Sequence, residues 1–231
     1  MRSEDAAALL AQTQIFGELS PLALASVADR AIDRSYKKGQ LIFHEGDLGD
    51  SLFVIVGGVV KVVVTSEEGD EMVLVTLRAP ETFGELAVID GGPRSASAET
   101  LEPTTVLVVT RSILLEVLRE HPPITEALLR SLGGLVRRLT EQASDLVFLD
   151  LPGRVAKLLL GLADDQGTKE DQGTVLDLHM TQTDLAGLVG GSRQSVNQIL
   201  RAFESRGYVE FHGRTVVIKD AALLRRRAGL T

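Results

Sequence analysis

The sequence predicts an α+β protein in which a β-rich region, a long helix and a smaller helical region with a hairpin follow one another. Three observations lead to this prediction. Short apolar runs separated by glycine turns occupy residues 36–109, leucines recur at heptad spacing over 128–149, and two helical patterns around a glycine turn precede a hairpin pattern near the C-terminus. A chain of 231 residues can hold more than one core, and we expect domains at 1–110, 111–150 and 151–231.

The N-terminal region is predicted to begin with short helices over residues 4–33, where Ser20-Pro21 is typical of a helix start. After Tyr36 the pattern changes to short runs of β-forming residues separated by glycines. These runs are 41–43, 52–56, 59–64, 72–77 and 105–109. Short strands with regularly spaced turns predict a sandwich or roll, with a hairpin turn at 66–70.

A regular leucine pattern follows the proline pair at 122–123, which should end a first helix near His121. The positions that share the heptad spacing are Leu128, Leu132, Leu135, Leu139, Gln142, Leu146 and Leu149. A narrow stripe of this kind, with one polar residue that can set register, is typical of a coiled coil. It favours a parallel homodimer, and packing of the helix on the β-rich region is the alternative.

Proline and glycine at 152–153 mark a boundary after this helix, and we expect a hinge at 149–153. Beyond it, Thr181-Gln182 caps and starts a helix, residues 190–192 form a turn, and a second helix begins at Arg193. This order predicts a helix-turn-helix whose side chains suit base edges and phosphates. The DNA-binding candidates are Thr181, Gln182, Ser192, Arg193, Gln194, Asn197, Gln198 and Arg201. Two β-patterned runs then flank a turn with Arg214 at its tip, which predicts a wing that contacts phosphate.

The stretch 83–98, FGELAVIDGGPRSASA, combines groups that a ribose-phosphate needs. Arg94 offers a guanidinium fork for paired phosphate oxygens, with the Ser95 hydroxyl beside it and glycines that allow close backbone approach. Glu85 has the same charge sign as phosphate, so it suits a sugar hydroxyl, whose proton it can accept. The alternative is a surface turn in which Arg94 only pairs with a neighbouring carboxylate.

The spacing of this stretch resembles the phosphate-binding cassette of cyclic-nucleotide-binding domains in bacterial regulators of the CRP/FNR family. The resemblance extends over nearly the whole chain, including the segment Phe148–Arg154. It implies an N-terminal double-stranded β-roll, a long dimerisation helix and a C-terminal winged helix. It further implies a homodimer that binds a pseudo-palindromic DNA site and contacts RNA polymerase. The ligand-binding residues it implies are Gly84, Glu85, Leu86, Arg94, Ser95 and Thr140.

Two helices depart from the family pattern, the dimer helix at one position and the recognition helix at two. Cyclic-AMP receptors carry adjacent polar residues on the dimer helix that bind adenine, whereas this chain has Leu139 followed by Thr140. The best-known members also carry Arg-Glu and, four positions after the Glu, Arg in the recognition helix, whereas this chain has Arg193-Gln194 and Gln198. We therefore expect relaxed base selectivity in the pocket and an altered DNA half-site.

Charge and composition limit the remaining possibilities. Residues 151–231 carry 11 Lys and Arg against 9 Asp and Glu, a net of +2, while residues 1–150 carry 13 against 23, a net of −10. Only the C-terminal third can approach DNA without repulsion. The chain has no cysteine, which excludes disulfides and cysteine-bound clusters, and its start predicts neither a signal peptide nor a membrane span, so we expect a cytoplasmic protein.

The sequence favours a DNA-binding regulator controlled by a cyclic nucleotide, cyclic AMP first. Control by a cyclic dinucleotide, or DNA binding without nucleotide, is the alternative. A cupin-like metal enzyme is a weaker hypothesis, because the four histidines do not converge. His44 lies in the β-rich region, and His121, His179 and His212 lie outside it, so we expect no metal site, no cofactor and no catalysis.

Overall fold

The computed structural model describes residues 1–171, 173–178 and 180–230, which form two compact units. The first unit contains Met1–Ser66 and Leu74–Arg138, and the second contains Glu67–Val73 and Leu139–Thr231. The segment 111–150, which the sequence suggested as a separate part, is therefore shared between the two units.

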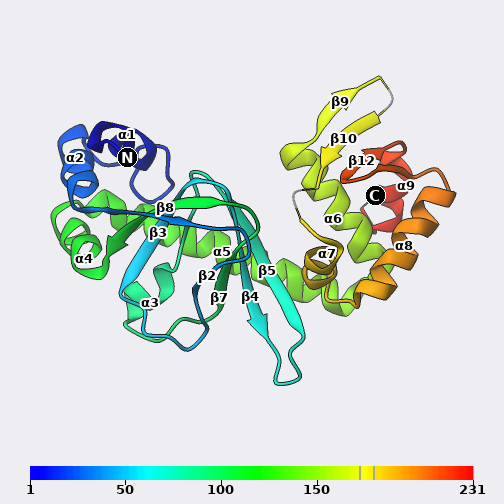
Figure 1. Cartoon of the computed structure of the whole chain (residues 1–231), viewed down its shortest axis with the longest axis horizontal. Helices are drawn as coiled ribbons and strands as arrows, with labels where there is room; N and C mark the ends of the chain where they lie inside the picture. The colour runs from blue at the N-terminus through cyan, green and yellow to red at the C-terminus, as the bar shows by residue number, and fades with distance from the viewer. Residues whose placement is uncertain (172, 179, 231) are drawn as a thin grey trace. The chain divides into compact units, whose positions relative to one another are not determined.

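The first unit combines short helices with two sheets (Figure 1). Its helices are α1 (Ser3–Leu10), α2 (Pro21–Arg30), α3 (Glu85–Asp90), α4 (Arg111–Glu120) and the first part of α5 (Pro122–Phe148). The strands are β1 (Ile32–Tyr36), β2 (Leu41–Phe43), β3 (Ser51–Gly57), β4 (Val59–Thr65), β5 (Glu71–Arg78, of which Glu71–Val73 are grouped with the second unit), β6 (Thr82–Phe83), β7 (Ser97–Thr100) and β8 (Thr104–Thr110).

The strands form two four-stranded sheets, in the orders β1-β8-β3-β6 and β2-β7-β4-β5. In the first sheet β8 runs antiparallel to both neighbours, so that Val108 lies opposite Ile32 of β1 and Phe53 of β3. Val108 and Phe53 belong to a buried cluster with residues of the other sheet, such as Val60 and Ala98. Two sheets that share a buried apolar interior confirm the predicted roll, and β4 and β5 flank the hairpin turn expected at 66–70.

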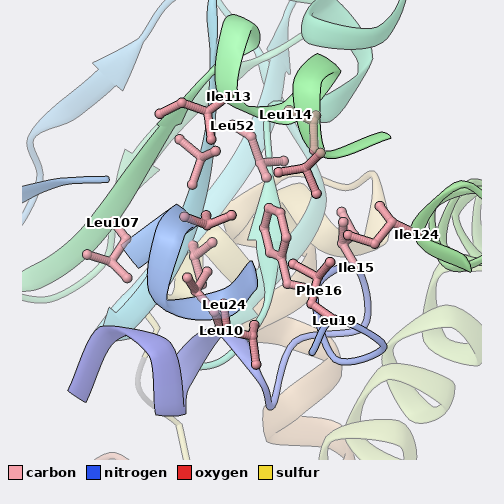
Figure 2. Packing of buried hydrophobic residues seen from close by; sticks show 14 of the residues in the cluster. Leu10, Ile15, Phe16, Leu19, Leu24, Leu52, Leu107, Ile113, Leu114 and Ile124 are labelled. Atoms are coloured by element: carbon pink, nitrogen blue, oxygen red, sulfur yellow. The ribbon is translucent and has the colours of Figure 1, made fainter. Parts of the chain in front are cut away.

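A second apolar core joins the helices of this unit to the first sheet. Figure 2 shows Phe16 and Ile15 among side chains that include Leu114 of α4 and Ile124 of α5. Leu52 of β3 belongs to the same buried cluster. This core fixes the start of α5 against the unit that carries the candidate ligand site.

The long helix α5 corrects one position of the predicted dimer seam. Leu128 is only 5% exposed and packs in the core around Ile124, so it is not available to a partner chain. By contrast, Leu129 is 62% exposed and Val136 is 61% exposed. Leu128 fits the heptad spacing because one face of α5 serves the intrachain core, where apolar residues recur at the same spacing, and the dimer seam itself stays a prediction.

The second unit contains the end of α5 and a helical domain with a sheet. Its other helices are α6 (Leu151–Gln166), α7 (Gln182–Val189), α8 (Arg193–Ser205) and α9 (Ala221–Arg227), and its strands are β9 (Thr168–Glu170), β10 (Gly173–Asp177), β11 (Val209–His212) and β12 (Thr215–Ile218). The sheet has the order β11-β12-β10-β9 with antiparallel neighbours. Helix, turn, helix and hairpin in this order confirm the predicted winged helix (Figure 1).

The segment predicted as a hinge is tied to its neighbours within the second unit. The Asp150 side chain caps α6 by accepting from Gly153 N at 2.9 Å and pairs with Arg227 of α9 at 2.6 Å. Arg154 donates to Leu149 O at 2.8 Å and to Val189 O, at the end of α7, at 2.7 Å. Lys157 of α6 pairs with Glu141 and Asp145 of α5 at 2.6 and 2.7 Å. These bonds hold the end of α5, α6 and the helix-turn-helix together as one body.

Candidate ligand site and nucleic-acid interface

The candidate ligand site is built around the short helix α3. Gly84 precedes the helix with φ of 81° and Gly91 follows it with φ of 73°, both in the left-handed region that favours glycine. At Gly84 a Cβ atom would lie 2.7 Å from Nη1 of Arg94 and would strike the guanidinium. The glycine therefore allows the backbone at the start of α3 to approach the arginine closely.

Arg94 is buried, with only 5% of its surface exposed. Its Nη1 donates to Gly84 O at 2.7 Å and its Nη2 donates to Ser51 O at 2.8 Å. Its Cζ lies 4.2 Å from the ring centroid of Phe43 and 5.5 Å from that of Phe53. Its Nε is buried without a hydrogen-bond partner among the described residues. A guanidinium has five donors, so this one keeps donor capacity in an enclosed site.

Gly49 provides the space for this arginine. A Cβ at position 49 would lie 2.2 Å from Cβ of Ala87 and 3.1 Å from Nε of Arg94. Any other residue would collide with α3 and push the guanidinium away. The backbone of Arg94 is also fixed to this loop, since its N donates to Asp47 O at 2.8 Å.

Glu85 is the first residue of α3, and its carboxyl is perturbed by the same enclosure. Burial raises the pKa of Glu85, while a backbone hydrogen bond and the charges of Arg138 and Arg94 act in the opposite direction. Burial also lowers the pKa of Arg94, against the attraction of Asp50, Asp47 and Glu85. Burial thus disfavours the charged form of both Glu85 and Arg94, while each favours the charge of the other. Perturbed groups of opposite charge in one site are typical of a binding site for a polar ligand.

The other predicted ligand residues have different positions. Leu86 of α3 is 37% exposed, and Ser95, next to Arg94, is exposed. Thr140 lies on the part of α5 that belongs to the second unit, so its contact with a ligand stays a prediction.

Sequence reasoning missed the aromatic residues beside Arg94. Phe43, Phe53 and Phe83 form a cluster with ring centroids 5.0 to 6.0 Å apart. Phe43 and Phe53 lie in runs predicted as strands, with nothing in the sequence to link them to Arg94, and only the fold places them against the guanidinium. Sequence reasoning also missed Arg138, whose charge acts on Glu85 from α5.

The candidate DNA interface lies on α7 and α8. The Thr181 side chain caps α7 in a reciprocal capping box with Asp184, and the Ser192 side chain caps α8 by accepting from Ser195 N at 3.1 Å. Gly190, with φ of 60°, ends α7 in the left-handed conformation and lets the chain turn toward α8. Thr181 was predicted as a cap and Ser192 as part of the turn, and both side chains hold the helix-turn-helix in shape. Thr181 and Ser192 remain exposed, as does Gln182.

One face of α8 is apolar and the other is polar. Val196, Leu200 and Phe203 are at most 5% exposed and form the core face, and Ile199, which the apolar pattern also assigns to this face, is half-buried. The predicted base-contacting residues lie on the opposite side of the helix. Arg193, Gln194, Gln198 and Arg201 are exposed, and Asn197 is half-buried.

The hairpin β11–β12 is attached to this helix. Glu204 of α8 accepts from Phe211 N at 3.2 Å, and Glu210 pairs with Lys219 at 2.9 Å across the hairpin. Arg214 is exposed in the turn between the two strands. Its backbone O accepts from Leu178 N at 3.0 Å, and its side-chain Nε donates to Leu178 O at 3.4 Å. The hairpin that carries Arg214 is thus bonded to α8 through Glu204 and to the segment before α7 through Leu178.

The described residues hold no group of three or more metal-ligating side chains. His179 lies outside the residues that the structure describes. Within the described ranges no helix combines the length and apolarity that crossing a membrane requires.

Comparison with known proteins gives the same two parts. The family model of the cyclic nucleotide-binding domain matches residues 33–121, and that of the Crp-like helix-turn-helix domain matches residues 153–227. The CRP-like cAMP-activated global transcriptional regulator of Mycobacterium tuberculosis is 37% identical over 220 residues, covering 95% of this chain and 98% of the relative. The cyclic AMP receptor protein of Thermus thermophilus is 34% identical over 191 residues, covering 83% of this chain and 85% of the relative. Among solved structures, the c-di-GMP responsive global regulator CLP of Xanthomonas campestris has the same fold, with a TM-score of 0.74, 24% identity and coverage of 85% and 99% of the two chains.

A β-roll that holds a buried arginine and a half-buried glutamate, followed by a winged helix, matches a cyclic nucleotide-binding domain followed by a helix-turn-helix domain. The chain belongs to the CRP/FNR family of transcription regulators. The members of this family are transcriptional regulators rather than enzymes, which confirms that part of the prediction.

Proposed function

We propose that the chain forms a homodimer whose DNA affinity is controlled by a cyclic nucleotide bound at α3, with cyclic AMP as the first candidate. The observation that carries this proposal is Arg94, a buried guanidinium whose Nε has no partner among the described residues. Its charge acts on the half-buried Glu85, whose pKa is raised by burial. The guanidinium would hold the cyclic phosphate with Ser95, and Glu85 with the Gly84 backbone would hold the ribose. Thr140 would contact the base.

Cyclic AMP is the first candidate because of the relatives. The M. tuberculosis regulator and the T. thermophilus receptor carry cyclic AMP in their names. Leu139, however, offers no hydrogen bond where cyclic-AMP receptors have a polar residue, so we expect weaker selection of the base. A cyclic dinucleotide is the second candidate, since the X. campestris neighbour is named as responsive to c-di-GMP.

The dimer is proposed to form through an exposed stripe on α5. The apolar positions Leu129, Leu132, Val136, Leu139, Ala143 and Leu146 step by 3, 4, 3, 4 and 3 residues. This stripe keeps Leu132, Leu139 and Leu146 of the seam predicted from the sequence. It has Leu129, Val136 and Ala143 on one side of these leucines, where the predicted seam has Leu128, Leu135 and Gln142. Leu139 is 39% exposed and Leu146 is 42% exposed, and a parallel partner helix would cover them.

DNA binding is proposed to use both recognition helices of the dimer, about 34 Å apart on a pseudo-palindromic site. Arg193 suits guanine, and Gln194 and Gln198 suit adenine, so we expect a half-site that differs from the usual one of the family. Arg214 of the wing would contact phosphate. Ligand binding would shift the population of dimers toward this DNA-competent arrangement in the cytoplasm, where RNA polymerase would be the partner.

Calorimetry tests the ligand assignment. Titration of the full chain with cyclic AMP should give saturable binding, and Arg94→Ala should weaken it about a hundredfold or more, because two charge-assisted hydrogen bonds are lost. Cyclic GMP and c-di-GMP, run alongside, report on base selection and on the second candidate. Equal binding of cyclic AMP to the wild type and to Arg94→Ala would contradict the proposed site. Binding of c-di-GMP without binding of cyclic AMP would identify the cyclic dinucleotide as the effector.

A further inference from the structure

Arg111, the first residue of α4, contacts the end of α3 that lies away from the proposed phosphate site. Its Nε donates to Val88 O at 2.8 Å. Its Nη2 would lie 3.6 Å from a Cβ placed at Gly91, the residue that ends α3. The guanidinium thus covers the C-terminal turn of the helix that begins at Glu85.

The same arginine is tied to the strand that supports Arg94. The backbone N of Arg111 donates to Asp50 O at 2.7 Å, and O of the next residue, Ser51, accepts from Nη2 of Arg94 at 2.8 Å. Arg94 also bonds Gly84 O at the start of α3. The two arginines therefore connect the same pair of segments, Asp50-Ser51 and α3, at opposite ends of the helix.

A helix of six residues needs such support. An isolated helix of this length is unstable in water, and its last carbonyl groups have no intrahelical partner. A cation at the C-terminal end satisfies a carbonyl and interacts favourably with the helix dipole. Val88 is buried in the same core as Ile113 and Leu114 of α4, so α3 is held to α4 by both polar and apolar contacts.

We propose that Arg111 is a positioning residue for the ligand site. It does not touch the nucleotide, but by holding the end of α3 it sets where Gly84 and Glu85 lie relative to Arg94. The inference rests on the proposed function for the identity of the ligand. The positioning itself can be measured without ligand.

The experiment compares Arg111→Met with Arg119→Met in the full chain. Arg119 is an exposed residue near the end of the same helix, so its replacement controls for loss of charge on α4. In the ligand-free protein, Arg111→Met should raise amide hydrogen exchange at least tenfold over residues 84–92 while the Tm changes by less than about 2 °C. The Kd for cyclic AMP should rise about tenfold. Arg111→Lys, which keeps a cation and a donor, should recover part of both effects, and Arg119→Met should change neither.

The outcomes separate this inference from the proposed function. Faster exchange confined to residues 84–92 supports the positioning role even if the wild-type chain does not bind cyclic AMP, in which case only the effector assignment fails. Unchanged exchange over residues 84–92 in Arg111→Met would overturn the inference. So would faster exchange throughout the first unit with a large fall in Tm, because that would indicate a general contribution to stability.

Discussion

At position 85 the chain keeps a carboxylate in a place where burial raises its pKa. A carboxyl with a raised pKa binds its proton more tightly in the folded than in the unfolded state. The free energy of unfolding therefore falls as pH rises from the pKa of Glu85 in the unfolded state to its pKa in the folded state. Above the folded-state pKa the loss of stability is complete. The charge is maintained at a cost to stability, as expected of a group kept for ligand binding.

Glu85→Gln should make the ligand-free protein more stable at neutral pH, with a rise in Tm of about 2 °C, and should weaken cyclic AMP binding about tenfold. The amide removes the ionisation cost but accepts a weaker hydrogen bond from the ribose. Thermal unfolding between pH 4 and 8 tests the first part, with the exposed Glu126→Gln on α5 as the control. The gain should shrink as pH falls. A gain independent of pH, or a less stable variant at pH 7, would contradict this reading of Glu85.

At the residue scale, short-range motifs were readable from the sequence and long-range contacts were not. Glu85 and Arg94 lie nine positions apart in one stretch, and their charges indicate a ribose-phosphate directly. Phe43, Phe53 and Arg111 belong to strands and helices far from that stretch. Their residue types fit ordinary core or surface positions, and only the fold brings them to the site.

At the element scale, α5 shows how one pattern can fit two faces. Leucines at 132, 139 and 146 give heptad spacing together with either of two neighbouring rows of residues. One flank is formed by 128, 135 and 142, and the other by 129, 136 and 143. Periodicity cannot separate the flanks, because a helix that packs on its own domain and on a partner has apolar residues on both sides. The exposed fraction of the side chains favours the second flank for the proposed seam, since Leu128 is buried and Leu129 and Val136 are exposed.

Val136→Glu should therefore weaken the dimer, because it places a carboxylate opposite its own copy in the proposed seam. We expect at least a tenfold rise in the dimer dissociation constant, measured by sedimentation equilibrium. Ser144→Glu, one position outside the seam, is the matched control and should remain dimeric. If Val136→Glu stays as dimeric as the control while Leu135→Glu dissociates without unfolding, the flank predicted from the sequence is the correct one.

At the scale of the whole molecule, charge is separated between the regions. Residues 1–150 carry a net charge of −10 and residues 151–231 carry +2. DNA should therefore contact only the C-terminal region, where Arg193, Arg201 and Arg214 are exposed, and the affinity for DNA should fall steeply with salt concentration.

The order of the two domains and their classes followed from the sequence. The assignment of residues 139–150 to the second unit did not, because it depends on Arg154, Lys157 and Arg227, whose partners lie elsewhere in the chain.

The central claim is that the site around Arg94 controls DNA binding by the winged helix. Its most direct test is fluorescence anisotropy with a labelled duplex recovered by selection on the wild-type chain, titrated with and without saturating cyclic AMP. We predict that cyclic AMP raises the DNA affinity of the wild type at least tenfold and leaves Arg94→Ala at the ligand-free level. An equal affinity of the wild type with and without cyclic AMP, or an equal response of Arg94→Ala, would contradict the account.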